Sequence, residues 1–291
     1  MNAIERYVAA TNLRQALAVL GDSGGATVLA GGTDLMPQTR AGHVAPAHTL
    51  LNIRRVEGLD GVEVDSGMLR LGTLVSVSTL LTNPLVRTHA SLLALAADHF
   101  ASDQIRNAAT LGGNICNASP AGDLLTPLLA LDAEIELASL ATGGSVKLRS
   151  VPLDGFFTGP GRTVRGAHEL LTAVRVPLAP PGQAVRFYKT GARPALEISA
   201  ISIAFAAHRD DSGHLRGVRV ALGAVAPTPL RARRTEAMLE GRALDAALAA
   251  QAAECAAAEA APIDDVRASA WYRLELLRNM TRRMLDDVAQ H

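Results

Sequence analysis

Two glycine-centred segments are the part of this chain best suited to chemistry, because each could bind a negatively charged ligand through its backbone. They read Ala30-Gly31-Gly32-Thr33-Asp34-Leu35 and Thr110-Leu111-Gly112-Gly113-Asn114-Ile115. Adjacent glycines let the backbone turn at positive φ and let a ligand approach the bare amides, and successive N–H groups can form a concave anion site. Two such segments could hold the two phosphates of a dinucleotide, although an isolated glycine pair is more often an ordinary turn.

The common phosphate-binding motifs are missing from the sequence. Neither G-x-G-x-x-G nor G-x-x-x-x-G-K-[ST] occurs, so a Rossmann site and a P-loop are both unsupported. The histidines and the two cysteines show no spacing typical of a metal site, and no Ser-His-Asp arrangement is evident. If the chain binds a dinucleotide, it therefore does so through a site of another design, and we expect no metal site and no catalytic side chain in this chain.

Composition excludes several classes of protein. The formal net charge is +0 and aromatic residues make up only 3%, whereas binding to nucleic acid needs a positive face. Two cysteines cannot form a disulfide framework. The N-terminus lacks the apolar region of a signal peptide, and no apolar run is long enough to span a membrane. The sequence indicates a cytoplasmic protein without a membrane span or a nucleic-acid partner.

Hydrophobic periodicity predicts the elements that position these segments. A short buried strand over residues 27–30 leads into the first glycine segment, and a strand is predicted over 68–77. A leucine-rich helix is predicted over 121–131, directly after the second glycine segment, which itself reads as a loop. Beyond a proline-rich stretch, alternating apolar residues predict antiparallel strands around 201–222, followed by helices to the C-terminus. Strands followed by helices favour an α+β fold.

Several motifs resemble the FAD-binding medium subunit of the xanthine dehydrogenase and carbon monoxide dehydrogenase family, the molybdenum hydroxylases. They are residues 27–35, 106–114 and 118–124, with further matches at 154–159, 169–171, 265–267 and 272–273. The resemblance implies an α+β fold in which an FAD-binding domain of the PCMH type precedes a C-terminal domain of antiparallel sheet plus helices. The implied ranges are 1–59 and 60–178 for two α/β subdomains of the FAD-binding domain, and 179–291 for the C-terminal flavoprotein domain.

The resemblance also implies which residues bind FAD. Backbone amides of both glycine pairs and of Thr33 would meet the pyrophosphate, with hydroxyl groups of Thr33 and Thr110 and the amide of Asn114 as further donors. The isoalloxazine would lie towards the C-terminal domain. The implied set is Leu29, Ala30, Gly31, Gly32, Thr33, Asp34, Leu35, Phe100, Thr110, Leu111, Gly112, Gly113, Asn114, Asp123, Leu171, Lys189 and Ile198.

Two charged members of this set have alternatives. Asp123 matches an acidic FAD contact and would serve a ribityl or ribose hydroxyl group; alternatively it caps a helix or binds its own loop. Lys189 matches a lysine near the flavin, where a cation would stabilise the anionic reduced flavin and raise its potential; alternatively it is a solvated lysine at a strand end.

The apolar members could equally belong to the hydrophobic core. Phe100 matches a position where some family members place an aromatic residue near the cofactor, and Leu171 matches an apolar flavin contact. Glu197 and Ile198 lie where the family covers one face of the flavin, and Tyr188 is a weaker candidate for that cover.

The predicted function is electron relay by bound FAD. A [2Fe–2S] cluster is held by four cysteine thiolates in its usual form, and this chain has two cysteines in all. The resemblance supplies the partners: a small [2Fe–2S] subunit and a large molybdopterin subunit, in a dimer of heterotrimers, with NAD, O₂ or another compound as electron acceptor. Two alternatives stay open, a stand-alone flavin oxidase of the vanillyl-alcohol type and a non-catalytic assembly subunit.

Overall fold

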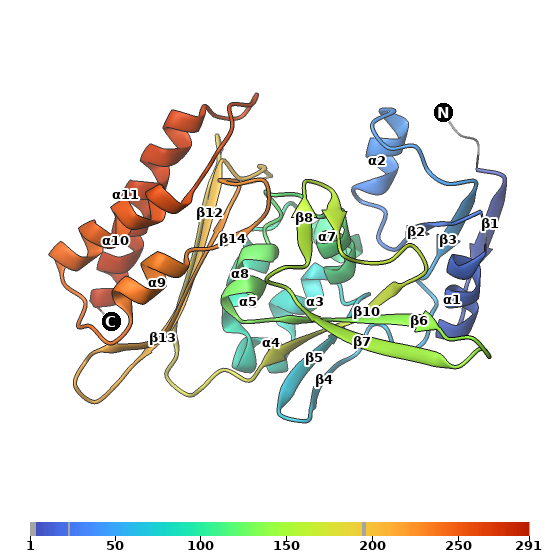
Figure 1. Ribbon diagram of the computed structural model, residues 1–291, viewed down its shortest axis with the longest axis horizontal. Coiled ribbons are helices and arrows are strands. Elements are labelled where there is room, and N and C mark those ends of the chain that lie inside the picture. The colour runs from blue at the N-terminus through green and yellow to red at the C-terminus, as the bar shows by residue number, and fades with distance from the viewer. Residues whose placement is uncertain (1–3, 23, 194–195, 291) are drawn as a thin grey trace.

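Three sheets follow one another along the long axis of the molecule (Figure 1). The computed structural model describes residues 4–22, 24–193 and 196–290 of the 291-residue chain. Within these ranges no helix has both the length and the apolar character needed to cross a membrane.

The first sheet is parallel and small. Its strand order is β1-β3-β2, and helix α1 connects β1 to β2. Asn12 caps α1, since its side chain accepts from the Gln15 N–H, and the buried face of the helix packs in one cluster with Ala138 and Leu170 of the next sheet. The elements are β1 (Arg6–Ala9), α1 (Leu13–Gly21), β2 (Thr27–Leu29), α2 (Leu35–Arg40) and β3 (Thr49–Asn52).

The second sheet is antiparallel throughout, in the order β4-β5-β10-β6-β7. Its strands are β4 (Val62–Asp65), β5 (Met68–Gly72), β6 (Glu134–Leu140), β7 (Val146–Pro152) and β10 (Leu170–Pro177), with a small ladder of β8 (Phe157–Gly159) and β9 (Arg162–Thr163). The helices are α3 (Val77–Thr82), α4 (Pro84–His89), α5 (Ser91–Asp98), α6 (Asp103–Ala108), α7 (Leu111–Asn117) and α8 (Leu125–Ala130). The strand expected over 68–77 ends at Gly72, and the helix expected over 121–131 is shorter.

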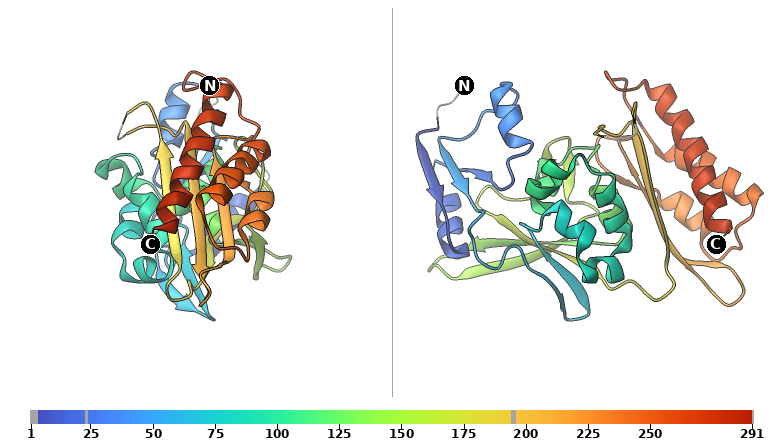
Figure 2. Two further views of the ribbon diagram at one scale, coloured as in Figure 1. Left: turned by 90° about the vertical axis from the view of Figure 1, so that its left-hand side faces the viewer. Right: turned by 180° about the vertical axis from the view of Figure 1, so that it is seen from behind.

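The third sheet is antiparallel and buried on both faces. Helices α9 to α11 cover one face, and α5 and α8 pack on the other (Figures 1 and 2), so β12 is a nearly continuous buried run. The elements are β11 (Ala184–Thr190), β12 (Ile201–Arg209), β13 (Leu215–Gly223), β14 (Leu230–Arg231), α9 (Arg233–Leu239), α10 (Ala246–Glu259) and α11 (Ala270–Ala289).

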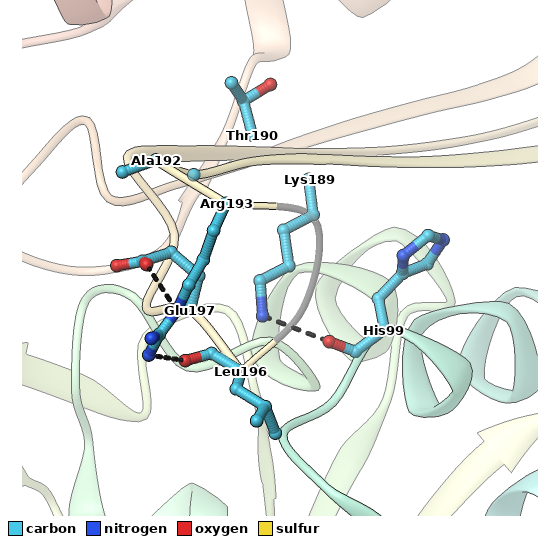
Figure 3. A pocket seen from close by; sticks show the side chains of 8 residues that line it. His99, Lys189, Thr190, Ala192, Arg193, Leu196 and Glu197 are labelled. Atoms are coloured by element: carbon cyan, nitrogen blue, oxygen red, sulfur yellow. Dashed lines mark hydrogen bonds and ion pairs between the residues drawn. The ribbon is translucent and has the colours of Figure 1, made fainter.

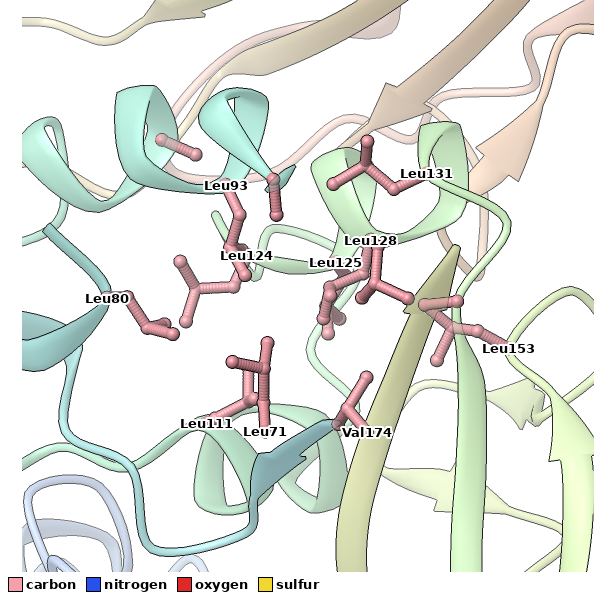
Figure 4. Packing of buried hydrophobic residues seen from close by; sticks show 14 of the residues in the cluster. Leu71, Leu80, Leu93, Leu111, Leu124, Leu125, Leu128, Leu131, Leu153 and Val174 are labelled. Atoms are coloured by element: carbon pink, nitrogen blue, oxygen red, sulfur yellow. The ribbon is translucent and has the colours of Figure 1, made fainter. Parts of the chain in front are cut away.

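The main hydrophobic core lies among the central helices, where leucines of α3, α5, α7 and α8 meet β5 and β10 (Figure 4). The same core includes Phe187, Ala204, Ala206 and Ala221 of the third sheet, so it crosses the boundary expected at residue 178. The predicted α+β arrangement is confirmed. A small parallel sheet with helices is followed by a larger antiparallel sheet with helices and by a C-terminal antiparallel sheet with helices. The division into three domain ranges stays a prediction.

Candidate functional site

The two glycine segments, distant in sequence, meet in the structure. Gly31 packs on the backbone just before the second segment, so closely that an added Cβ would lie 2.0 Å from the Ala108 carbonyl oxygen and 3.2 Å from the Ala109 Cα. A side chain at position 31 would therefore overlap the neighbouring backbone. The two segments, which the resemblance implies share one ligand, are therefore neighbours in the fold.

The first segment has the features expected of an anion site. Gly32 adopts a φ of +73°, the left-handed conformation that favours glycine. Among the described residues, the N–H groups of Gly31, Gly32 and Thr33 donate to no acceptor of the chain. Because strong backbone donors are rarely left unpaired unless water or a ligand accepts from them, this loop is well suited to hold phosphate oxygens. Asp34 is exposed and bonds to the Gln38 amide.

The second segment is a helix start, which corrects the expected loop. Thr110 caps α7 by accepting from the Gly113 N–H at 3.1 Å, and the Gly112 N–H donates to the Thr73 carbonyl oxygen at 2.9 Å. Neither glycine has positive φ. Both amides are thus used inside the chain, and their expected role as phosphate donors is not supported by this conformation. Gly112 instead permits close packing, since a Cβ there would lie 1.7 Å from Thr73 Oγ1.

Other groups of the second segment remain available to a ligand. The Asn114 side-chain oxygen is buried and has no hydrogen-bond partner, and an asparagine can present either its oxygen or its NH₂ group by flipping. The Thr110 hydroxyl accepts one bond and still has its own proton to donate. A buried polar atom without a partner indicates a missing partner group, so Asn114 fits a ligand-binding role.

Asp123 and Lys189 form a buried ion pair. The Lys189 Nζ lies 2.6 Å from Asp123 Oδ2, with side chains only 8% and 10% exposed. Ser199 Oγ donates to Asp123 Oδ1 at 2.8 Å, and Lys189 also donates to the His99 carbonyl oxygen at 3.1 Å. Burial raises the pKa of the Asp123 carboxyl, and the Lys189 ammonium opposes that shift. Lys189 is therefore not a solvated strand-end lysine, and Asp123 caps no helix.

A cavity of about 320 Å³ lies beside this pair (Figure 3). Its wall is formed by His99 and Lys189 together with Thr190, Gly191, Ala192, Arg193, Leu196 and Glu197. Glu197 is ion-paired with Arg193 at 3.1 Å and lines the cavity. Leu196 and Ile198 are 54% and 50% exposed nearby, which leaves apolar surface free for a planar ring.

Three apolar or aromatic candidates lie elsewhere. Leu171 is 2% exposed within the main core, which favours its packing role, and Phe100 is partly buried against the same core. Tyr188 points away from the cavity: its hydroxyl bonds to Asp287 of α11 and its ring packs on the C-terminal core. Tyr188 is therefore wrong as a flavin cover, because neighbouring residues of a strand point to opposite faces and Lys189 occupies the cavity side.

The structure gives a supporting role to residues to which the sequence analysis assigned none. Arg106 donates to the carbonyl oxygens of Asp98 and Phe100 at 3.1 and 2.8 Å, on either side of the His99 carbonyl that Lys189 contacts. Arg273 ties the Ala200 carbonyl, next to Ser199, to α11. Arg106 and Arg273 belong to the matched ranges 106–114 and 272–273, but their partners lie outside those ranges and are revealed by the fold.

The arrangement is suited to binding and electrostatics rather than to acid–base or metal chemistry. No cluster of metal-ligating side chains occurs in the part of the chain that the structure describes. The site offers free backbone amides and a close-packed glycine cradle at one end, with a buried cation beside a cavity at the other. These features match a large ligand with an anionic middle and a planar end.

Comparisons with known proteins agree with this geometry. The family described as the FAD binding domain in molybdopterin dehydrogenase matches residues 2–179, and the CO dehydrogenase flavoprotein C-terminal domain matches residues 186–288. A putative xanthine dehydrogenase FAD-binding subunit of Escherichia coli K12 is 34% identical, over 97% of this chain and 94% of its own length. The glyceraldehyde dehydrogenase medium chain of Sulfolobus acidocaldarius is 32% identical, over 97% and 98%.

Solved structures show the same fold. A chain of carbon monoxide dehydrogenase from Hydrogenophaga pseudoflava aligns with a TM-score of 0.91 at 30% identity, covering 98% of this chain and 97% of that one. A chain of quinoline 2-oxidoreductase from Pseudomonas putida 86 aligns with a TM-score of 0.90 at 29% identity, covering 99% and 98%.

Proposed function

The chain belongs to the family of FAD-binding domains of molybdopterin dehydrogenases, and from this premise we propose that it is the flavin-carrying electron-transfer subunit of a multi-subunit molybdenum hydroxylase. The observation that supports this most strongly is the meeting of the two glycine segments, with free amides at Gly31, Gly32 and Thr33. Bound FAD supplies the redox chemistry, and the protein supplies position and electrostatics.

The residues present fit FAD. Gly31 gives a cradle that a Cβ would fill, and Asn114 provides a buried polar atom without a partner. We propose that the first segment holds the pyrophosphate through its backbone, with Thr110 and Asn114 beside it. The isoalloxazine would occupy the cavity region next to Lys189 and Glu197. Phosphate oxygens accept charge-assisted hydrogen bonds, which are stronger than neutral ones.

The proposed partners are inferred from the small number of cysteines in this chain. Two cysteines cannot ligate a [2Fe–2S] cluster in its usual form, so electrons would reach this FAD from clusters on another subunit. We propose a small [2Fe–2S] subunit and a large molybdopterin subunit, in a dimer of heterotrimers in the cytoplasm, with NAD or another acceptor receiving the electrons. Names such as "medium chain" and "FAD-subunit" among the relatives support a complex of this kind.

Acid precipitation of the purified chain tests the cofactor assignment. We expect FAD to be released to the supernatant, because the proposed site binds its phosphates by hydrogen bonds. Flavin that stays with the precipitated protein would favour an oxidase of the vanillyl-alcohol type, and a chain that binds no flavin would favour the assembly subunit. Either result would overturn the proposal.

A further inference from the structure

The buried ion pair beside the cavity links two distant parts of the chain. Asp123 precedes α8, whereas Lys189 lies near the end of β11, and their charged atoms are 2.6 Å apart. Ser199 holds the second carboxylate oxygen at 2.8 Å, and the His99 carbonyl accepts from the ammonium at 3.1 Å. Each charged group therefore has two partners, and its position is fixed by several elements at once.

Of the charged side chains near the cavity, Asp123 and Lys189 are the least exposed to solvent. Lys189 and Asp123 are almost fully buried, so water screens them weakly. The other charged pair of the cavity, Arg193 and Glu197, is more exposed, at 63% and 22%. The ring of His99 lies against the ring of Phe187, with centroids 5.8 Å apart. His99 contacts Lys189 through its backbone carbonyl oxygen and not through its imidazole.

We propose that Asp123 is a positioning residue that holds Lys189 at the cavity wall and balances its charge, so that the pair, rather than Lys189 alone, sets the electrostatic field on the flavin. This inference rests on the proposed function, since it needs FAD in the cavity. It revises the expectation that the lysine charge acts unopposed, and it gives Asp123 a role within the protein that does not depend on a bond to a flavin hydroxyl group.

The charges of Asp123 and Lys189 should then shift the flavin potential in opposite directions, and the effect of removing Asp123 should depend on the presence of Lys189. Replacing Asp123 by asparagine leaves an unbalanced cation, which stabilises the negative charge that FAD gains on reduction and shifts the potential upwards. Replacing Lys189 by methionine as well removes that cation. The potential of the double variant should therefore return close to the wild-type value, because neither protein has net charge at this position.

Redox titration of four proteins tests the proposal: wild type, Asp123→Asn, Lys189→Met and the double variant. We expect a higher potential for Asp123→Asn and near-recovery in the double variant. An unchanged potential in Asp123→Asn, or the same shift whether or not Lys189 is present, would overturn the inference. Asp210→Asn is the matched control, because Asp210 pairs with Arg216 at 2.9 Å on an exposed hairpin and its loss should not move the potential.

Thermal unfolding of the FAD-free proteins gives a second reading that does not depend on the cofactor. Removing one member of a buried pair leaves an uncompensated charge and is destabilising, so Asp123→Asn should unfold at a lower temperature and the double variant should recover part of the loss. If Asp123→Asn does not fold, the double variant still tests the pairing, because removal of Lys189 as well should restore a folded protein. A double variant no more stable than Asp123→Asn would contradict the pairing, whereas a chain that folds but takes up no FAD would contradict the proposed function.

Discussion

Replacing Gly31 by alanine is expected to weaken the binding of FAD while leaving most of the fold intact. The new Cβ would lie 2.0 Å from the Ala108 carbonyl oxygen and 2.8 Å from its carbon, and backbone atoms cannot move away as a flexible side chain can. Relieving the overlap must separate the two glycine segments. Overpacking of this kind costs roughly 1–3 kcal/mol. A loss of that size in binding free energy lowers FAD affinity by about 5- to 150-fold, measured by flavin absorbance and titration of the FAD-free protein.

Gly61→Ala is the matched control for this substitution. Gly61 has no atom within 4 Å of an added Cβ, and its φ is not positive, so the control should keep wild-type FAD content. A Gly31→Ala protein that binds FAD as tightly as this control would show that the contact between the two segments does not form the site.

The second large effect is expected for Arg273→Met. The guanidinium is buried and donates to the carbonyl oxygens of Ala200 and Ala224 at 2.8 and 2.7 Å and to Asp265 at 2.7 Å. Methionine removes the donor to both carbonyl oxygens, while Asp265 keeps its bonds from the Arg267 and Ala268 N–H groups. Breaking a buried ion pair costs about 3–5 kcal/mol, and we expect a loss below that range because Asp265 is 25% exposed. Urea unfolding should show this loss of stability. FAD content should fall too, because Ala200 adjoins Ser199, which holds Asp123.

Arg282→Met controls for removal of an arginine from the same helix. Arg282 is 59% exposed and lies 4.0 Å from Asp286, a surface pair of the kind that contributes about 0–1 kcal/mol. Equal stability of the Arg273→Met and Arg282→Met proteins would mean that Arg273 does not secure this part of the fold.

The sequence predicted the helices and strands that have a clear local hydrophobic periodicity. The α+β class and the C-terminal antiparallel strands were expected and are present. The second segment was interpreted as a loop, although Thr110 three residues before Gly113 is a helix-capping pattern. The glycines there were attributed to positive φ, whereas Gly112 is needed because Thr73 packs against it.

Contacts between residues that are distant in the sequence could not be predicted from local sequence patterns. Asp123 and Lys189 were each identified, but their contact depends on how α8 packs on the third sheet. Ser199 and Arg273 act only through that packing. The error at Tyr188 was avoidable, since strand alternation places it opposite Lys189.

The most direct test of the central claim is purification of the tagged chain from its own cells, followed by native mass spectrometry and by flavin, iron and molybdenum analysis. The account predicts a complex of this chain with two other polypeptides, containing FAD, iron and molybdenum, from which the separated chain retains FAD alone. A metal-free protein made only of this chain, whose flavin is reduced directly by a substrate, would contradict it.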